Sequence, residues 1–374
     1  MAVKNKFVIT GGGTGGHIYP GIAIARAILD IDPETRIIFI GGKGQRESII
    51  VPKSGFEFMP ILVQSFPRNL SLRWLKVFVK VPMGFFTSIS ILSDFKPNAV
   101  IATGGYVCGP VALAAILLRI PVLIQEQNAF PGITNRILGR WVDEIHIPFI
   151  EASKYFPPDK IHITGNPIRP EITTAIDSRE KLGLDMNKLT VTFLGGSQGA
   201  KSINSAVLGA LDYLKSLSSE IQIIHQTGEF DFPRIKEAYS NSTINALVQP
   251  FFYSLEEIYA SSDLVICRSG AMTLAEITAR GLPAILVPYP YAAGDHQTFN
   301  ARVLEDKGAA IMIKDNQLTG EFLAKTITDL IKDKQTLNDM SEKSLSLGKP
   351  YASKDIARAA FLIIKKGKIG LFAN

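Results

Sequence analysis

Residues 7–17 have the sequence Phe7-Val8-Ile9-Thr10-Gly11-Gly12-Gly13-Thr14-Gly15-Gly16-His17, in which a short apolar run is followed at once by a glycine-rich loop. The run has the composition of a buried parallel strand, and the glycines permit a tight turn into a following helix. Backbone N–H groups at such a turn, together with the helix dipole, attract a phosphate or another anion. The stretch therefore predicts the first strand, loop and helix of a Rossmann-like domain.

The same alternation of strand and helix continues along the chain and then begins again. Val- and Ile-rich runs predict strands at 36–40, 99–102 and 121–124, and a second series at 189–194, 221–225, 246–248, 264–266 and 284–287, with a helix at 272–280. Two prolines and a glycine interrupt both periodicities at 164–170, which is typical of a connection between domains. We expect an α/β protein with two Rossmann-like, doubly wound parallel-sheet domains facing a cleft.

Length and composition agree with two folded domains. The chain has 374 residues, 46% of them hydrophobic and 20% charged, which provides enough apolar material for two cores and argues against disorder. The net charge of +6 favours an anionic partner without identifying it. The two cysteines, Cys108 and Cys267, have no metal-ligand spacing and predict a reduced, cytosolic protein. We expect neither an export signal at residues 1–6 nor a membrane span at 70–92, where charges and Pro82 interrupt the apolar run.

Two further loops resemble the first one in design. Residues 195–200, Gly-Gly-Ser-Gln-Gly-Ala, follow a predicted strand, and residues 267–276 again lead from a strand into a helix through small residues. The helix start at Ala271 suits a diphosphate, and Glu276, one turn further, suits the two hydroxyls of a ribose. Such glycines also make ordinary tight turns, so the pairing of the loops favours a nucleotide site more than either loop alone.

A nicotinamide-dependent oxidoreductase is an alternative of another class. A dinucleotide domain needs an acidic residue at the end of its second strand to hold the ribose, but Gly41 and Gly42 occupy that place. Asp30 and Asp32 precede the strand, and Pro33 follows them, so we expect a solvated turn there and not a metal site. NADH titration would distinguish this alternative.

Several segments together resemble the MurG family of peptidoglycan glycosyltransferases. They are residues 11–17, 195–200 and 267–288, supported by 104–110, 125–128, 165–169 and 295–297. The resemblance implies a glycosyltransferase B fold, and a domain division into 1–164 plus a C-terminal helix at about 350–374, facing acceptor and membrane, and 165–349, binding the donor. It also implies an inverting hexosyltransferase that moves N-acetylglucosamine from UDP-N-acetylglucosamine to the 4-hydroxyl of undecaprenyl-diphosphate-linked N-acetylmuramyl pentapeptide.

The resemblance also implies site residues. Those for the donor are Thr14, Gly15, Gly16, Asn128, Arg169, Ser197, Phe252, Ala271, Met272, Thr273, Leu274, Ala275, Glu276 and Gln297. Phe252 departs from the family, which more often has an aliphatic residue there. Acceptor-side candidates are Gly104, Gly105, Tyr106 and Glu126.

His17 is the candidate general base, because an imidazole accepts a proton near neutral pH. Hydrogen bonding of His17 to the loop backbone is the alternative role. The helix start at Ala271, Ser197 and Arg169 would meet the charge of the leaving diphosphate, so we expect no metal and no cofactor.

Basic and aromatic residues alternate with aliphatic ones at 66–86, which suits an anionic lipid surface or else an ordinary amphipathic helix. We therefore expect a peripheral protein on the cytoplasmic face of the plasma membrane, with UDP-N-acetylglucosamine and a lipid acceptor as partners and no nucleic acid. A glycolipid synthase using diacylglycerol and a non-catalytic nucleotide-sugar sensor remain as alternatives.

Overall fold

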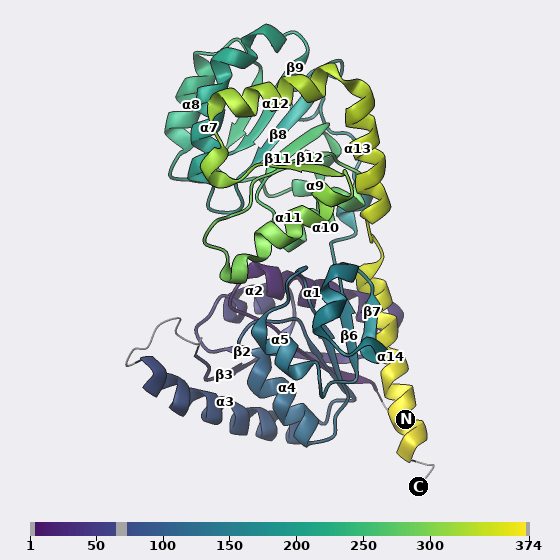
Figure 1. Cartoon of the computed structure of the whole chain (residues 1–374). Coiled ribbons are helices and arrows are strands. Elements are labelled where there is room, and N and C mark those ends of the chain that lie inside the picture. The colour runs from purple at the N-terminus through teal and green to yellow at the C-terminus, as the bar shows by residue number, and fades with distance from the viewer. Residues whose placement is uncertain (1–3, 65–72, 372–374) are drawn as a thin grey trace. The chain divides into compact units, whose positions relative to one another are not determined.

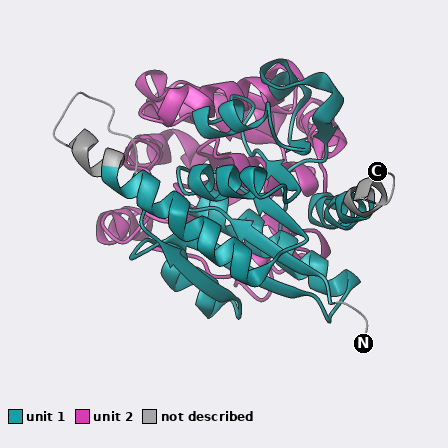
Figure 2. Cartoon of the chain, turned by 90° about the horizontal axis from the view of Figure 1, so that it is seen from below, with its two compact units in different colours: residues 1–168, 351–374 teal, residues 169–350 magenta. Residues whose placement is uncertain are grey.

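The computed structural model describes residues 4–64 and 73–371, and for residues 73–78 and 366–371 it describes the backbone alone. The chain forms two compact units, residues 1–168 together with 351–374, and residues 169–350 (Figure 2). The chain passes from unit 1 to unit 2 after Ile168 and returns to unit 1 after Pro350.

Unit 1 contains a seven-stranded parallel sheet in the order β3-β2-β1-β4-β5-β6-β7 (Figure 1). Its strands are β1 (Lys6–Thr10), β2 (Arg36–Gly42), β3 (Glu57–Ile61), β4 (Ala99–Ala102), β5 (Val122–Gln125), β6 (Glu144–Ile147) and β7 (Ile161–Ile163). The order of the strands reverses between β1 and β4, which is the doubly wound topology.

Successive residues of a strand point to opposite faces of the sheet, so apolar side chains lie on both faces. Helices cover both faces and bury these side chains. They are α1 (Gly15–Ile31), α2 (Glu47–Lys53), α3 (Arg73–Phe95), α4 (Cys108–Leu117), α5 (Ile133–Leu138) and α14 (Ala352–Leu371), with short 3-10 turns η1 (Ile150–Tyr155) and η2 (Pro158–Lys160). Phe7 and Ile9 of β1 pack in one cluster with α1 and α14, whereas Val8 packs in the other with α3, α4 and α5.

Helix α14 completes unit 1 although it follows unit 2 in sequence. Its residues Ile356, Ala360 and Ile363 are buried in the cluster that contains Phe7. The ring of Phe361 lies edge-on to the ring of Phe7, with centroids 5.3 Å apart. Unit 1 is therefore discontinuous in sequence.

Unit 2 repeats the design with a six-stranded parallel sheet in the order β10-β9-β8-β11-β12-β13. Its strands are β8 (Leu189–Leu194), β9 (Ile221–Gln226), β10 (Ala246–Gln249), β11 (Leu264–Cys267), β12 (Ala284–Leu286) and β13 (Ala310–Met312). Its helices are α6 (Glu171–Thr174), α7 (Lys201–Leu214), α8 (Phe232–Ser240), α9 (Leu255–Ala260), α10 (Ala271–Ala279), α11 (His296–Asp306), α12 (Gly320–Lys332) and α13 (Lys334–Leu347), with 3-10 turns η3 (Lys215–Leu217), η4 (Ala293–Asp295) and η5 (Asp315–Gln317). Here the order reverses between β8 and β11.

The prediction of two doubly wound parallel sheets is confirmed. Every strand that the sequence predicted is present, but β3, β6, β7 and β13 were not predicted. Cys108 and Cys267 are both buried and unpaired. In the described ranges no helix is both long and apolar enough to cross a bilayer.

Candidate functional site

In each unit, two loops leave the carboxyl ends of the strands at which the strand order reverses. In unit 1 these loops follow β1 and β4, and in unit 2 they follow β8 and β11. Open parallel sheets bind ligands at this place, since neighbouring loops there turn to opposite faces and leave room between them. Most of the predicted site residues lie in these four loops or at the helix starts that follow them.

His17 lies on α1, directly after the first glycine loop, and its ring is fixed by two acceptor atoms. Nδ1 lies 2.8 Å from Oε1 of Gln127 and 3.1 Å from the carbonyl oxygen of Thr103. The amide nitrogen of Gln127 donates to the carbonyl oxygens of Thr103 and Gln125 at 2.6 and 3.0 Å, so its oxygen is the atom that faces His17. Nδ1 therefore holds the proton, and Nε2 is left as the basic nitrogen.

Gly104 and Gly105 allow the loop after β4 to approach His17. Both have positive φ, at 101° and 84°, and a Cβ on Gly104 would lie 2.8 Å from Nδ1 of His17. A Cβ on Gly105 would collide with the carbonyl oxygen of Gly12. The hydroxyl of Thr103 donates to the carbonyl oxygen of His17 at 2.7 Å. Gly104 and Gly105, which were predicted on the acceptor side, thus shape the surroundings of His17 through the backbone.

A carboxylate of α2, which the sequence analysis missed, is hydrogen-bonded to the first glycine loop. Glu47, at the start of α2, is buried and accepts the N–H of Gly13 at 3.1 Å and the N–H of Gly42 at 3.0 Å. Because the N–H of Gly13 already donates to Glu47, the negative charge of this carboxylate opposes the binding of a second anion there. Burial and the charge of Glu47 raise the pKa of Tyr106, so this half-buried side chain is a neutral phenol.

The start of α1 remains accessible beside this carboxylate. Thr14 and Gly16 are exposed and Gly15 is half-buried. Thr14 is the N-cap of α1, and its side chain makes no capping hydrogen bond. Thr14, Gly15 and Gly16, which were predicted to contact the donor, are therefore open to a ligand. Glu47 makes the neighbouring Gly13 unfavourable for an anion.

Glu126 orders the loop after β5, because both of its carboxylate oxygens accept hydrogen bonds. One accepts the N–H groups of Gln127 and Asn128 at 2.8 and 2.9 Å and the Asn128 side-chain amide at 3.2 Å. The other accepts from Asn135 at 2.8 Å and from the N–H of Gly132 at 3.2 Å. Glu126 thus holds Gln127, and through it the ring of His17, and it fixes Asn128 in the same loop.

In unit 2 the loop after β8 presents Ser197 at the surface. Gln226 lies beneath this loop: its amide nitrogen donates to the carbonyl oxygen of Gly196 at 2.9 Å, and its oxygen accepts the N–H of Phe252 at 2.9 Å. The ring of Phe252 is buried in a small apolar cluster. A ligand contact at Phe252 would therefore use its backbone carbonyl group, which does not depend on the type of side chain at this position.

The start of α10 follows the loop after β11. Its N-cap is Gly270, without a side-chain hydrogen bond to the first turn. The side chain of Leu274 is buried in the core, whereas Ala271, Met272, Thr273 and Ala275 are half-buried. Gln297 of α11 supports this turn, since its carbonyl oxygen accepts the hydroxyl of Ser269 at 2.8 Å.

Glu276 is the most perturbed carboxylate of the predicted site. Burial raises its pKa to about 7, while the hydrogen bond from Tyr259, 2.9 Å long, and the charge of Arg169 act in the opposite direction. Arg169 itself forms an ion pair with Glu256 at 3.2 Å. The structure thus brings Glu276 and Arg169 into one network and adds Tyr259 and Glu256, which the sequence analysis missed.

Within the described ranges, no three His, Cys, Asp or Glu side chains lie close enough together to hold a metal ion. Asp30 is exposed, and Asp32 accepts hydrogen bonds from Asn5 and Thr35 at 3.0 and 2.9 Å. The bond from Asn5 is the main reason that the pKa of Asp32 lies below its usual value. This carboxylate closes the turn before β2.

Comparison with known proteins adds three findings. Residues 7–147 match the glycosyltransferase family 28 N-terminal domain, and residues 190–357 match the glycosyltransferase family 28 C-terminal domain. Two curated relatives are the UDP-N-acetylglucosamine--N-acetylmuramyl-(pentapeptide) pyrophosphoryl-undecaprenol N-acetylglucosamine transferases of Desulforamulus reducens and Halothermothrix orenii. They are 42% and 46% identical over 96% and 93% of this chain, and over 99% and 96% of their own. The crystal structure of Acinetobacter baumannii MurG superimposes with a TM-score of 0.78 at 30% identity, covering 95% of this chain and 99% of that one.

Proposed function

The chain belongs to the MurG family within glycosyltransferase family 28, and we propose that it is the hexosyltransferase that adds N-acetylglucosamine to lipid-linked N-acetylmuramyl pentapeptide in peptidoglycan synthesis. The donor is UDP-N-acetylglucosamine, and the acceptor sugar is attached through a diphosphate to undecaprenol. The observation on which the proposal chiefly rests is the identity of 46% with a transferase of this name over 93% of the chain.

The proposed base is Nε2 of His17. Because Gln127 and Thr103 accept the proton on Nδ1, the lone pair on Nε2 is available to remove a proton from the 4-hydroxyl of the acceptor sugar. The acceptor oxygen then bonds to the anomeric carbon of N-acetylglucosamine as the bond from that carbon to the UDP oxygen breaks. A single displacement of this kind inverts the configuration at the anomeric carbon.

The proposed donor site lies in unit 2. The uncapped start of α10 and the exposed Ser197 offer hydrogen-bond donors to the diphosphate, which gains negative charge as it leaves. Glu276 would accept hydrogen bonds from the ribose, and Gln297 and Arg169 would complete the site. The buried Glu47 of unit 1 supports this assignment of the diphosphate to unit 2, since it disfavours an anion at Gly13.

The proposed location is the cytoplasmic surface of the plasma membrane. The predicted segment 66–86 lies partly outside the described residues, but Val79 and Phe86 of α3 are 59% and 67% exposed. Leu117 of α4 is 63% exposed, and Ile133 and Ile137 of α5 are also exposed. Helices α3, α4 and α5 pack together with one face of the unit 1 sheet, so these apolar side chains belong to one layer of the unit. Such a layer suits a lipid surface.

Transfer of radiolabelled N-acetylglucosamine from its UDP derivative tests the proposal. We expect label in lipid when the acceptor is the diphosphate-linked N-acetylmuramyl pentapeptide and none when it is diacylglycerol. Label in diacylglycerol would make the protein a different glycolipid synthase. Binding of UDP-N-acetylglucosamine without release of UDP in the presence of either acceptor would make it a nucleotide-sugar sensor.

A further inference from the structure

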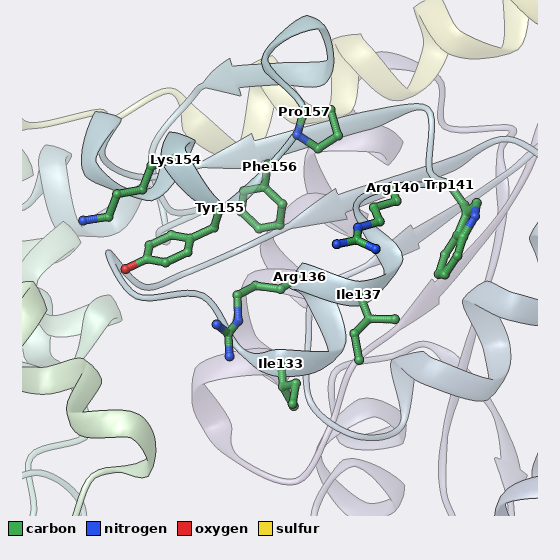
Figure 3. A pocket seen from close by; sticks show the side chains of 9 residues that line it. All are labelled: Ile133, Arg136, Ile137, Arg140, Trp141, Lys154, Tyr155, Phe156 and Pro157. Atoms are coloured by element: carbon green, nitrogen blue, oxygen red, sulfur yellow. The ribbon is translucent and has the colours of Figure 1, made fainter.

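Two features of the structure take no part in the chemistry proposed above. One is a pocket of about 630 Å³ in unit 1, between α5 and η1 (Figure 3). Ile133 and Ile137 line this pocket, so it belongs to the apolar layer already assigned to the membrane surface. The other is the buried side chain of Gln226 in unit 2, to which nothing above assigns a function.

Gln226 is the last residue of β9 and lies where three parallel strands end side by side. β9 is placed between β8 and β10 in the sheet. Gln226 is in register with Leu194, the last residue of β8, and with Gln249, the last residue of β10. Its side chain is only 3% exposed. It therefore lies beneath the loops at this edge of the sheet and not at the surface where a ligand would bind.

The amide of Gln226 connects two of these loops. Its Nε2 donates to the carbonyl oxygen of Gly196, in the loop after β8, at 2.9 Å. Its Oε1 accepts the N–H of Phe252, in the loop after β10, also at 2.9 Å. Because one partner is an acceptor and the other a donor, the amide fits in one orientation only. Loss of this side chain would leave the buried N–H of Phe252 without its partner.

The loop after β9 fills the space between the other two with its backbone. Gly199 and Gly228 have positive φ, at 78° and 77°. A Cβ on Gly199 would collide with the carbonyl oxygen of Thr227, and a Cβ on Gly228 with the carbonyl oxygen of Gln198. The N–H of Gly228 donates to the carbonyl oxygen of Pro250 at 3.0 Å. The three loops thus form one block, held together by backbone contacts and by the Gln226 amide.

The two loops that this amide joins belong to different parts of the proposed donor site. The loop after β8 presents Ser197, which is proposed to meet the diphosphate. The loop after β10 leads into α9, whose Tyr259 donates to Glu276, the carboxylate proposed for the ribose, at 2.9 Å. Uracil and diphosphate are attached to different carbons of that ribose. With the diphosphate at Ser197, the backbone carbonyl of Phe252 is left for the uracil.

We propose that Gln226 is a positioning residue for the donor, which sets the distance between a uracil subsite at Phe252 and a diphosphate subsite at Ser197. The inference rests on the proposed donor site of unit 2 and deepens it. When the two subsites are held at the right distance, binding of one end of UDP brings the other end within reach of its own subsite. A fragment that uses one subsite gains nothing from this link, because it follows its own loop.

Gln226→Met tests the link, since methionine has a similar volume but makes neither hydrogen bond. Calorimetry with UDP should show roughly tenfold weaker binding, because two hydrogen bonds that hold the loops are lost. Binding of uridine, followed by ligand-observed NMR, should weaken less than about twofold. The KM for UDP-N-acetylglucosamine should rise by about the same factor as the Kd for UDP, while kcat at saturating donor changes little.

Gln222→Met is the matched control. Gln222 lies on the same strand and is fully buried. It also donates to one backbone carbonyl oxygen and accepts one backbone N–H, both of Asp185 and both at 2.8 Å. Asp185 precedes β8, so these bonds lie away from the loops at the carboxyl ends of the strands. We expect both variants to lose thermal stability to a similar degree, and only Gln226→Met to lose affinity for UDP.

Gln226→Glu adds a readout that a loss of packing alone would not change. A protonated carboxyl group has one donor and one acceptor, as the amide has, whereas a carboxylate has no donor for the carbonyl oxygen of Gly196. Burial favours the protonated form. This variant and the unaltered protein should therefore bind UDP about equally at pH 5, and the variant roughly tenfold more weakly at pH 8. A ratio of affinities that does not change with pH would overturn the proposal.

Two further results would also overturn it. Equal affinity of Gln226→Met and Gln222→Met for UDP would mean that Gln226 stabilises the fold and nothing more. A loss of uridine binding as large as that of UDP binding would mean that it supports the uracil loop alone and links no subsites. Failure of the unaltered protein to bind UDP would remove the donor site itself, whereas normal UDP binding in every variant would remove only the role of Gln226.

Discussion

At the scale of single residues, the tautomer of His17 is the central feature of the proposed chemistry. His17→Ala should lower kcat by about 10² to 10⁴ and change the KM for the donor little, because a general base acts in the transition state. His162→Ala, which removes an exposed histidine from the edge strand β7, is the matched control. A kcat of His17→Ala close to that of this control would contradict the role as base and leave His17 a loop-ordering residue.

The raised pKa of Glu276 predicts a pH-dependent stability. Folding moves this pKa from 4.5 to about 7, so the folded protein holds the proton more tightly than the unfolded chain does. The resulting stabilisation is complete below pH 4.5 and is lost as the pH rises through 7. Glu276→Gln removes this dependence, so its free energy of unfolding relative to the unaltered protein should increase between pH 5 and pH 8 by up to about 3 kcal/mol.

Urea unfolding at the two pH values measures this difference. Glu237→Gln, an exposed glutamate of α8, corrects for the general effect of removing a carboxylate. A difference for Glu276→Gln that stays constant with pH would show that the carboxylate is ionised throughout.

Sequence patterns predicted His17 and Glu276 as candidates but not the residues that determine their properties. Gln127 is 110 residues from His17, and Glu47 is 34 residues from Gly13, so no local pattern connects either pair. The sequence shows a glutamate, Glu47, soon after the pair Gly41-Gly42, but it does not show that this side chain is buried or that it accepts the N–H of Gly13. Tyr259 likewise reaches Glu276 from another helix.

At the scale of elements, the start of α10 predicts a reaction without a metal. An uncapped helix start and neighbouring donors can neutralise the leaving diphosphate. Turnover should therefore continue in excess EDTA. A loss of activity that Mg²⁺ or Mn²⁺ restores would contradict this role of α10.

The packing of α14 predicts a sharp difference between two positions on the same helix. Ala360 is fully buried against unit 1, whereas Leu362 is 54% exposed. Ala360→Asp would bury a carboxylate without a partner and should lower the free energy of unfolding by about 3 kcal/mol or more. Leu362→Asp should change it little, and thermal unfolding of both variants measures the contrast. Equal effects would mean that α14 does not pack on unit 1 through this face.

The strands that the sequence did not predict were missed for two physical reasons. β3, β7 and β13 are edge strands, and the three residues of β7, Ile161-His162-Ile163, are half-buried or exposed. β6 contains Glu144 and His146 among its four residues. β3 and β13 do contain apolar residues, but an edge strand has one neighbour only, so its burial depends on the rest of the fold. In β6 and β7 polar residues interrupt the apolar run.

At the scale of the whole molecule, unit 2 should be able to fold alone. All six strands of its sheet, and Arg169, Ser197, Glu276 and Gln297, lie within residues 169–350. A fragment of these residues should therefore give cooperative unfolding and bind UDP, measured by calorimetry. Residues 1–168 alone lack α14, would expose the apolar cluster around Phe7, and should aggregate. Failure of the first fragment to fold, or stability of the second, would contradict this division.

The return of α14 to unit 1 also sets an order for biosynthesis. Most nascent proteins fold from their N-terminal domain onward while the ribosome is still translating. Here the first sheet waits for a helix that is translated only after residue 350, so the later unit acquires its structure while the earlier one still lacks a cover. A chain whose translation stalls after residue 350 and before α14 would therefore contain a completed second unit attached to a first unit with exposed apolar residues, which is the kind of surface that chaperones bind.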